Sequence, residues 1–236
     1  MTAFKKTVSA VAVCAAFLVS SHAMAANDLT LKVTGTIAPA ACTPALSGNG
    51  EVAYGSMATS AITTAPTGND LVQLGSKVIT ATISCEAAAT VGFKITDNRA
   101  DSALALSETA YLTNGGADLS DITSSSFGFG LGLASNDAKI GAYSVVADTA
   151  NATADGDEVT VITSDDNITW AKSVQSGLSG DGSRIVTVAA PGTTIPKLFT
   201  ELSMPLKVTA GVQTKSVLGG DSITLDGNAT LTMVYL

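Results

Sequence analysis

Few residues in this chain could do acid–base, nucleophilic or metal chemistry. The only histidine is His22, and the three cysteines are Cys14, Cys42 and Cys85. With a single histidine the chain has little material for a Ser-His-Asp triad, a Cys-His pair or a zinc site of the usual kind. No serine stands three residues before a lysine, so the Ser-x-x-Lys nucleophile of penicillin-recognising enzymes is missing as well.

Two other patterns could suggest a ligand. Gly128, Gly130 and Gly132 alternate with large apolar residues, which is typical of strand packing rather than of a phosphate-binding loop. The acidic groups at 155–157 and 165–167 lack the spacing of a calcium-binding EF-hand loop and are interpreted as surface turns. Aromatic residues make up only 5%, so few are present to line a sugar-binding cleft with paired catalytic carboxylates. We therefore expect a protein that is not an enzyme and has no metal or cofactor.

The composition indicates a folded, acidic protein. Its 236 residues are 46% hydrophobic and 14% charged, with a formal net charge of −8. A disordered chain would combine low hydrophobicity with high charge density, so a packed core is expected. An excess of carboxylates repels phosphate, and nucleic acid is therefore not expected as a partner.

The first 25 residues have the pattern of a secretory signal peptide. Lys5 and Lys6 precede an apolar stretch at 8–19, and Ala23-Met24-Ala25 supplies a small-residue cleavage site. The apolar stretch spans about 18 Å as a helix, too little to cross a hydrocarbon core of about 30 Å. We expect export, with no membrane span. The mature chain would lack histidine and carry a net charge of −10.

Two cysteines remain once the leader is removed. An even pair in an exported chain favours a disulfide between Cys42 and Cys85, with two buried free thiols as the alternative. Closing a loop of about 44 residues should stabilise the fold by roughly 4 kcal/mol in the chain-entropy model.

The elements that must carry these residues are predicted to be strands. Apolar and polar residues alternate with a period of two, and no window shows a helical stripe. Short strands with Gly, Asn and Asp punctuation are typical of an antiparallel β-sandwich. The polar stretch 135–181 is interpreted as an elaborated loop or extra hairpins on a single domain. The segments expected to be extended are 29–37, 51–54, 77–85, 90–96, 127–133, 159–162, 184–188, 202–208 and 223–235.

The most regular stripes lie near the two ends of the mature chain. Leu29, Leu31 and Val33 form one of them, and Leu231 and Met233, with Tyr235, form the other. Chain ends usually fray, so a regular apolar stripe there calls for a reason. Either both strands complete the chain's own sheets, or one of them pairs with another chain by strand addition.

These ends resemble the subunits of chaperone–usher fimbriae, and especially the poorly characterised fimbrial-like exported proteins near that group. The resemblance rests on Gly35-Thr-Ile37 followed by Cys42, on Cys85, and on the ending 229–235 with its penultimate tyrosine. It implies an immunoglobulin-like, pilin-type sandwich that lacks its seventh strand. The domain would cover residues 35–236, preceded by an amino-terminal extension at 26–34, and Cys42 and Cys85 would join its first two strands.

The resemblance also implies how the chain would work. Leu29, Leu31 and Val33 would be the donor strand that fills a neighbouring subunit, and Leu231, Met233 and Tyr235 would be the strand held by a periplasmic chaperone. Partners would be that chaperone, an outer-membrane usher and neighbouring subunits. The expected function is a structural subunit of a surface fimbria assembled by donor-strand exchange. The alternative is a monomeric exported binding protein or adhesin that completes its own sheet.

Overall fold

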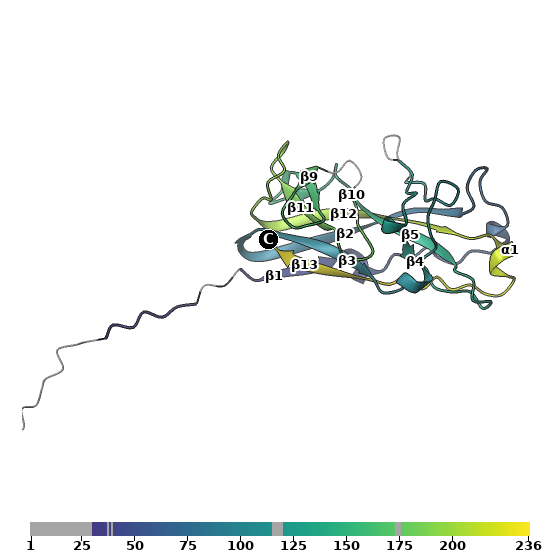
Figure 1. Ribbon diagram of the computed structural model, residues 1–236, viewed down its shortest axis with the longest axis horizontal. Helices are drawn as coiled ribbons and strands as arrows, with labels where there is room; N and C mark the ends of the chain where they lie inside the picture. The colour runs from purple at the N-terminus through teal and green to yellow at the C-terminus, as the bar shows by residue number, and fades with distance from the viewer. Residues whose placement is uncertain (1–29, 37, 39, 115–119, 173–175) are drawn as a thin grey trace, which may run out of the picture. The chain divides into compact units, whose positions relative to one another are not determined.

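The computed structural model describes residues 30–36, 38, 40–114, 120–172 and 176–236. By its internal packing the chain divides into Met1–Ala38 and Pro39–Leu236, and all the assigned strands belong to the second unit (Figure 1). These strands form two antiparallel sheets, which confirms the expected all-β sandwich. No helix within the described ranges is long and apolar enough to cross a membrane.

The first sheet is built on two long strands. β2 (Val72–Ala89) pairs with β12 (Phe199–Val212) along nearly their whole length, and β5 (Gly141–Ala147) pairs with the other side of β12. The order is β1-β2-β12-β5-β10, so that β1 lies at one edge. The shorter strands of this sheet are β1 (Cys42–Leu46), β4 (Phe129–Gly130), β6 (Thr153–Ala154), β7 (Asp157–Glu158) and β10 (Ser176–Gly177).

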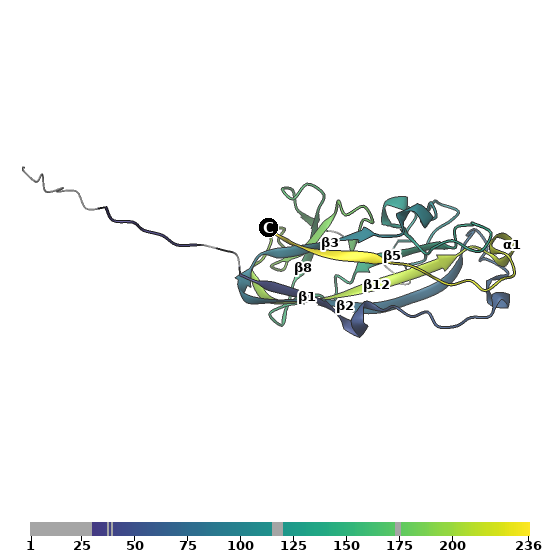
Figure 2. The same cartoon turned by 90° about the horizontal axis from the view of Figure 1, so that it is seen from below.

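The second sheet has the order β13-β3-β11-β8-β9, and β13 is one of its edges. Figure 2 shows β13 lying over the sheet that contains β1, β2 and β12. Its strands are β3 (Val91–Asp97), β8 (Thr160–Ser164), β9 (Ala171–Lys172), β11 (Ile185–Ala189) and β13 (Ala229–Tyr235). Helical turns are few: η1 (Ser47–Gly50), η2 (Thr59–Ile62), η3 (Ala100–Ser102), η4 (Ser125–Phe127) and α1 (Lys215–Leu218).

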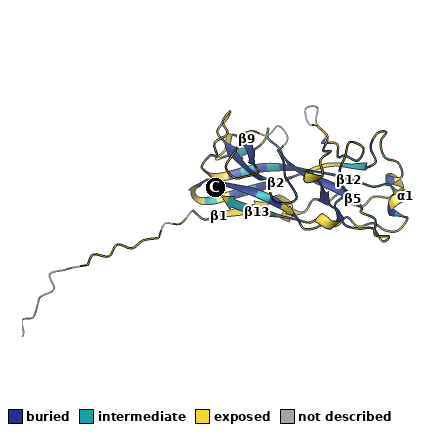
Figure 3. Cartoon of the chain, in the orientation of Figure 1, coloured by how far each residue is buried: buried dark blue, intermediate teal, exposed yellow. Residues whose placement is uncertain are grey.

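The main core lies between the two sheets, where the strands are buried (Figure 3). Phe93, Phe129 and Phe199 are fully buried there, and the rings of Phe129 and Tyr143 stack at 5.1 Å between centroids. Burying side chains of this size contributes about 1.5–3 kcal/mol each. Four phenylalanines remain after residue 25, and three of them lie in this core, so the scarce aromatic residues are used for packing.

A second, smaller apolar cluster covers the outer face of the first sheet. It joins Ala142 and Val146 of β5 to side chains of the segment 104–127, among them Leu106, Leu112 and Ile122. Every residue of β5 is therefore buried. The interpretation of 135–181 as an elaborated loop or extra hairpins is wrong at β5, which is a central strand of the first sheet. Burial on both faces removes the alternation that marks a half-exposed strand. The rest of that stretch contains the short strands β6 to β10.

Two further predicted strands are shorter than expected. Of the segment 127–133 only Phe129–Gly130 is a strand, and a Cβ added to Gly130 would lie 2.1 Å from the carbonyl oxygen of Arg99. The glycine thus allows a close approach between backbones, as the packing interpretation requires. The last strand begins at Ala229 rather than at residue 223. Residues 30–36, predicted to be extended as a strand, are assigned to none.

Candidate functional site

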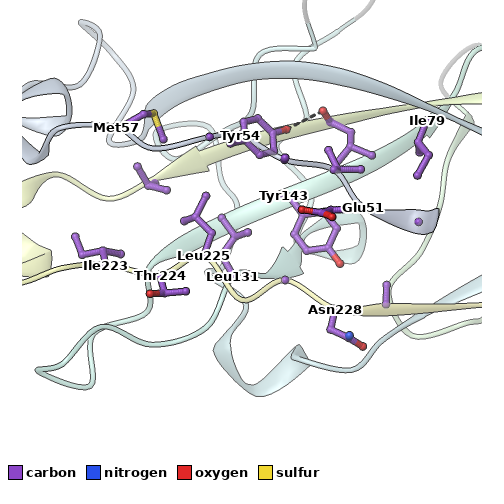
Figure 4. Close-up of a pocket in the computed structure, with 18 of the residues that line it drawn as sticks. Glu51, Tyr54, Met57, Ile79, Leu131, Tyr143, Ile223, Thr224, Leu225 and Asn228 are labelled. Carbon is purple, nitrogen blue, oxygen red and sulfur yellow. Dashed lines mark hydrogen bonds between the residues drawn. The ribbon is translucent and has the colours of Figure 1, made fainter. Parts of the chain in front are cut away.

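A groove of about 880 Å³ runs between the segment 49–59, which follows the edge strand β1, and the segment 222–231, which leads into the edge strand β13 (Figure 4). One wall is Leu46 with residues 49–59, and the other is residues 222–225 and 227–229 with Leu231. The floor is the core itself, since side chains from both sheets reach it: Ile79, Ile95, Leu131, Tyr143, Val145, Leu206 and Val208. The core of the sandwich is therefore reached from outside through this groove.

Tyr54 joins the first wall to the first sheet by hydrogen bonds. Residues 51–58 form no strand, and the hydroxyl of Tyr54 reaches across to the first sheet, where it lies 2.9 Å from the carbonyl oxygen of Val208 and 3.3 Å from that of Gly75. Gly75 has a φ of 83° at an irregularity in the pairing of β2 with β12. The extended piece 51–54 was predicted, whereas its role as a groove wall was not.

Ionising Tyr54 should loosen this wall. Burial raises the pKa of Tyr54 from 10.0 to about 12. A group whose pKa is higher in the folded state stabilises the fold below its unfolded value, and that contribution is lost as the pH rises through the folded value. We expect the free energy of unfolding to fall between about pH 10 and pH 12. In Tyr54→Phe, urea titrations over this range should show a smaller fall; an identical fall would contradict the assignment to Tyr54.

The second wall includes the open edge of β13. At its two ends the ladder between β13 and β3 is marked by bonds from Asn98 N–H to Asn228 O and from Leu236 N–H to Thr90 O. The even-numbered residues of 228–236 therefore direct their backbone groups toward β3. In an antiparallel pair the intervening residues direct theirs the other way. The backbone groups of Ala229, Leu231 and Met233 therefore point to the open edge, while their side chains are half-buried. This edge can bind an added strand.

The disulfide joins β2 to the start of β1, the strand that precedes the first wall. Cys42 lies opposite Cys85 in the pairing of β1 with β2, and the two are bonded with an S–S distance of 2.03 Å. The prediction of this bond is confirmed, as is its placement between the first two strands. β1 has only five residues and, among the described strands, pairs with β2 alone, so the covalent link reinforces this single pairing.

The other predicted site residues are placed as follows. Leu231 and Met233 lie half-buried on β13, and Tyr235 ends the strand with its side chain partly exposed. Of the predicted donor residues, Leu31 and Val33 are 88% and 87% exposed. Leu29 lies outside the described residues. The floor residue Tyr143 was not predicted from the sequence, because it belongs to the strand β5, which has no alternating apolar stripe.

The acidic groups shape turns. Asp155 accepts hydrogen bonds from the Thr200 hydroxyl and from the backbone N–H groups of Thr200 and Glu201, and these bonds hold its pKa below the ordinary value. Asp166 accepts from Ile168 and Thr169 in the same way, and its pKa is also lowered. Across the described ranges no group of three or more His, Cys, Asp or Glu side chains is arranged to hold a metal ion.

The fold and the groove define a class: an antiparallel β-sandwich with a groove that reaches its core. Comparison with known proteins then identifies the family. Residues 31–144 match the family described as Protein of unknown function (DUF1120). The chain is 35% identical to Protein GltF of Escherichia coli (strain K12), over 99% of both chains, and 32% identical to Uncharacterized protein YhcF of the same strain, over 91% of this chain and 93% of that one. It belongs to the family of GltF and YhcF. No solved structure matches it.

Proposed function

We propose that this chain is a structural subunit of a surface fimbria, in which a strand from a neighbouring subunit fills the groove. The observation that carries this proposal is the groove between residues 49–59 and 222–231, with the apolar core as its floor and the start of the β13 edge in one wall. An added strand would supply main-chain hydrogen bonds to β13 and apolar side chains to the floor.

Residues 29–37 of a second copy fit this groove in length and pattern. The groove follows residues 223–231, about nine residues or 30 Å of extended chain. The segment 29–37 has the same length and carries alternating Leu29, Leu31, Val33 and Ile37. Leu31 and Val33 are exposed, so their apolar surface is available to a partner. Burying each such side chain is worth about 1.5–3 kcal/mol before ordering costs.

The geometry favours a neighbour over self-completion. The Tyr235 hydroxyl at the end of β13 contacts the backbone of Ala40 and Cys42, where the domain begins. An extension that folded back from Ala40 into its own groove would run parallel to β13, after a tight reversal. An extension from a second copy is free to pair antiparallel, and antiparallel pairing is slightly more stable per residue.

An empty groove of this kind would expose apolar surface after export. We therefore include in the proposal a periplasmic chaperone that covers the groove and contacts the β13 face of Leu231, Met233 and Tyr235, and an outer-membrane usher that exchanges the chaperone for the next subunit. Exposed apolar surface and an unpaired strand edge otherwise lead to aggregation, which gives such a chaperone its physical purpose.

The test uses the protein lacking residues 1–25. Incubated at high concentration, it should form a ladder of heat-resistant oligomers on gels, and a peptide of residues 26–38 should suppress the ladder. Hydrogen exchange should find the amides of residues 30–36 unprotected in the monomer and protected in oligomers. Strong protection in a pure monomer that never forms a ladder would contradict the proposal and favour the self-completing binding protein or adhesin.

A further inference from the structure

Beyond one end of the groove, a side chain joins the two edge strands. The Tyr235 hydroxyl donates a hydrogen bond to the carbonyl oxygen of Ala40 at 3.0 Å and accepts one from the N–H of Cys42 at 3.1 Å. The phenol thus ties the last residues of β13 to the first residues of β1, between the edges of the two sheets.

The edge of β1 beside this tie offers little to an added strand. Glu86 N–H bonds to Ala41 O, so in the register of β1 with β2 it is Cys42, Pro44 and Leu46 that direct their backbone groups away from β2. The N–H of Cys42 is used by Tyr235, and proline has no N–H. Only Leu46 keeps a donor on this edge, and Leu46 is also the β1 residue that lines the groove.

The extent of the groove agrees with these contacts. On the β13 side its lining ends at Leu231, and on the β1 side it ends at Leu46. Met233, Tyr235, Pro44 and Cys42 lie beyond, where the two edges are tied together. An entering strand therefore meets a barrier after Leu231.

Such a barrier has a purpose, because the apolar stripe cannot set the register alone. A slip by one residue would turn the stripe to the wrong face. A slip by two residues keeps every apolar side chain on the correct face, so alternation does not oppose it. Only a physical stop distinguishes these two registers.

We infer that Tyr235 is a positioning residue that sets the register of the added strand, because its hydroxyl ties β13 to β1 and stops the strand at Leu231. This inference rests on the proposed strand exchange. If residues 29–37 of the donor pair antiparallel with residues 223–231, Leu29 lies opposite Leu231 and Leu31 lies opposite Ala229. A slip of two residues toward Tyr235 would bring it opposite Leu231.

Disulfide capture measures the register directly. A peptide of residues 26–38 carrying Leu31→Cys is mixed with the protein of residues 26–236. The protein carries either Ala229→Cys or Leu231→Cys. Facing Cβ atoms in an antiparallel pair are close enough to bridge. We expect capture at position 229. Adding Tyr235→Phe should raise capture at 231 relative to 229 about tenfold, which corresponds to about 1.4 kcal/mol.

The control is Tyr111→Phe, which removes a hydroxyl outside the groove and should leave the capture ratio unchanged. Circular dichroism checks that each variant is folded. Equal capture at 229 and 231 without Tyr235→Phe, or a ratio that Tyr235→Phe leaves unchanged, would overturn the role of Tyr235 while retaining strand binding. If the peptide binds no version of the protein, the proposed function itself fails.

Discussion

Replacing Leu31 with aspartate is expected to abolish assembly and leave the subunit folded. Leu31 is 88% exposed, so its replacement removes no core contact from the chain's own fold. In a neighbour's groove the carboxylate would lie against an apolar floor without a partner, and burying an unpaired charge is costly. We expect the ladder of oligomers to disappear, with association weakened about a hundredfold or more.

The matched control is Thr30→Asp, which adds the same charge one position away. Side chains alternate across a strand, so this carboxylate would face solvent and the ladder should persist. Leu31→Asp subunits keep an intact groove and should cap growing chains, so that mixing them with unmodified subunits shortens the ladder. Equal loss of assembly in both variants, or equal persistence, would remove Leu31 from the donor face.

The second large effect is expected from replacing Cys42 and Cys85 with serine. The bond closes a loop with a sequence separation of 43 and ties the five-residue edge strand β1 to β2. Its loss should lower the free energy of unfolding by about 2–5 kcal/mol. Because Tyr235 bonds to the backbone of Cys42, the tie beyond the end of the groove should loosen with it.

Urea denaturation of the double variant, followed by circular dichroism, measures this loss. The unmodified protein with its disulfide reduced should unfold at the same urea concentration as the double variant, which separates loss of the bond from effects of the new serines. Thiol titration of the unreduced, unfolded protein should find no free thiol from Cys42 or Cys85. A loss well below 1 kcal/mol would contradict the role given to the bond.

The sequence alone determined those features that depend on local alternation and on residue counts. The stripes at 77–85, 90–96 and 202–208 each have one face toward the core, and the structure contains them in β2, β3 and β12. The disulfide followed from an even pair of cysteines flanking predicted strands. One-sided burial leaves a period of two in the sequence, which makes such strands readable.

Only the tertiary structure decided the rest. β5 is covered on both faces, by the main core and by the cluster around Leu112, so its sequence carries no alternation. The groove is enclosed by residues 46–59, by the segment 222–231 and by core side chains of both sheets, and segments so far apart in the chain leave no local pattern for the cavity between them. The bonds from Tyr235 to Ala40 and Cys42 join the two ends of the domain, 195 and 193 positions apart. Contacts between residues so far apart depend on how the sheets pack. Local sequence patterns predict each strand, but they do not show which distant residues come into contact.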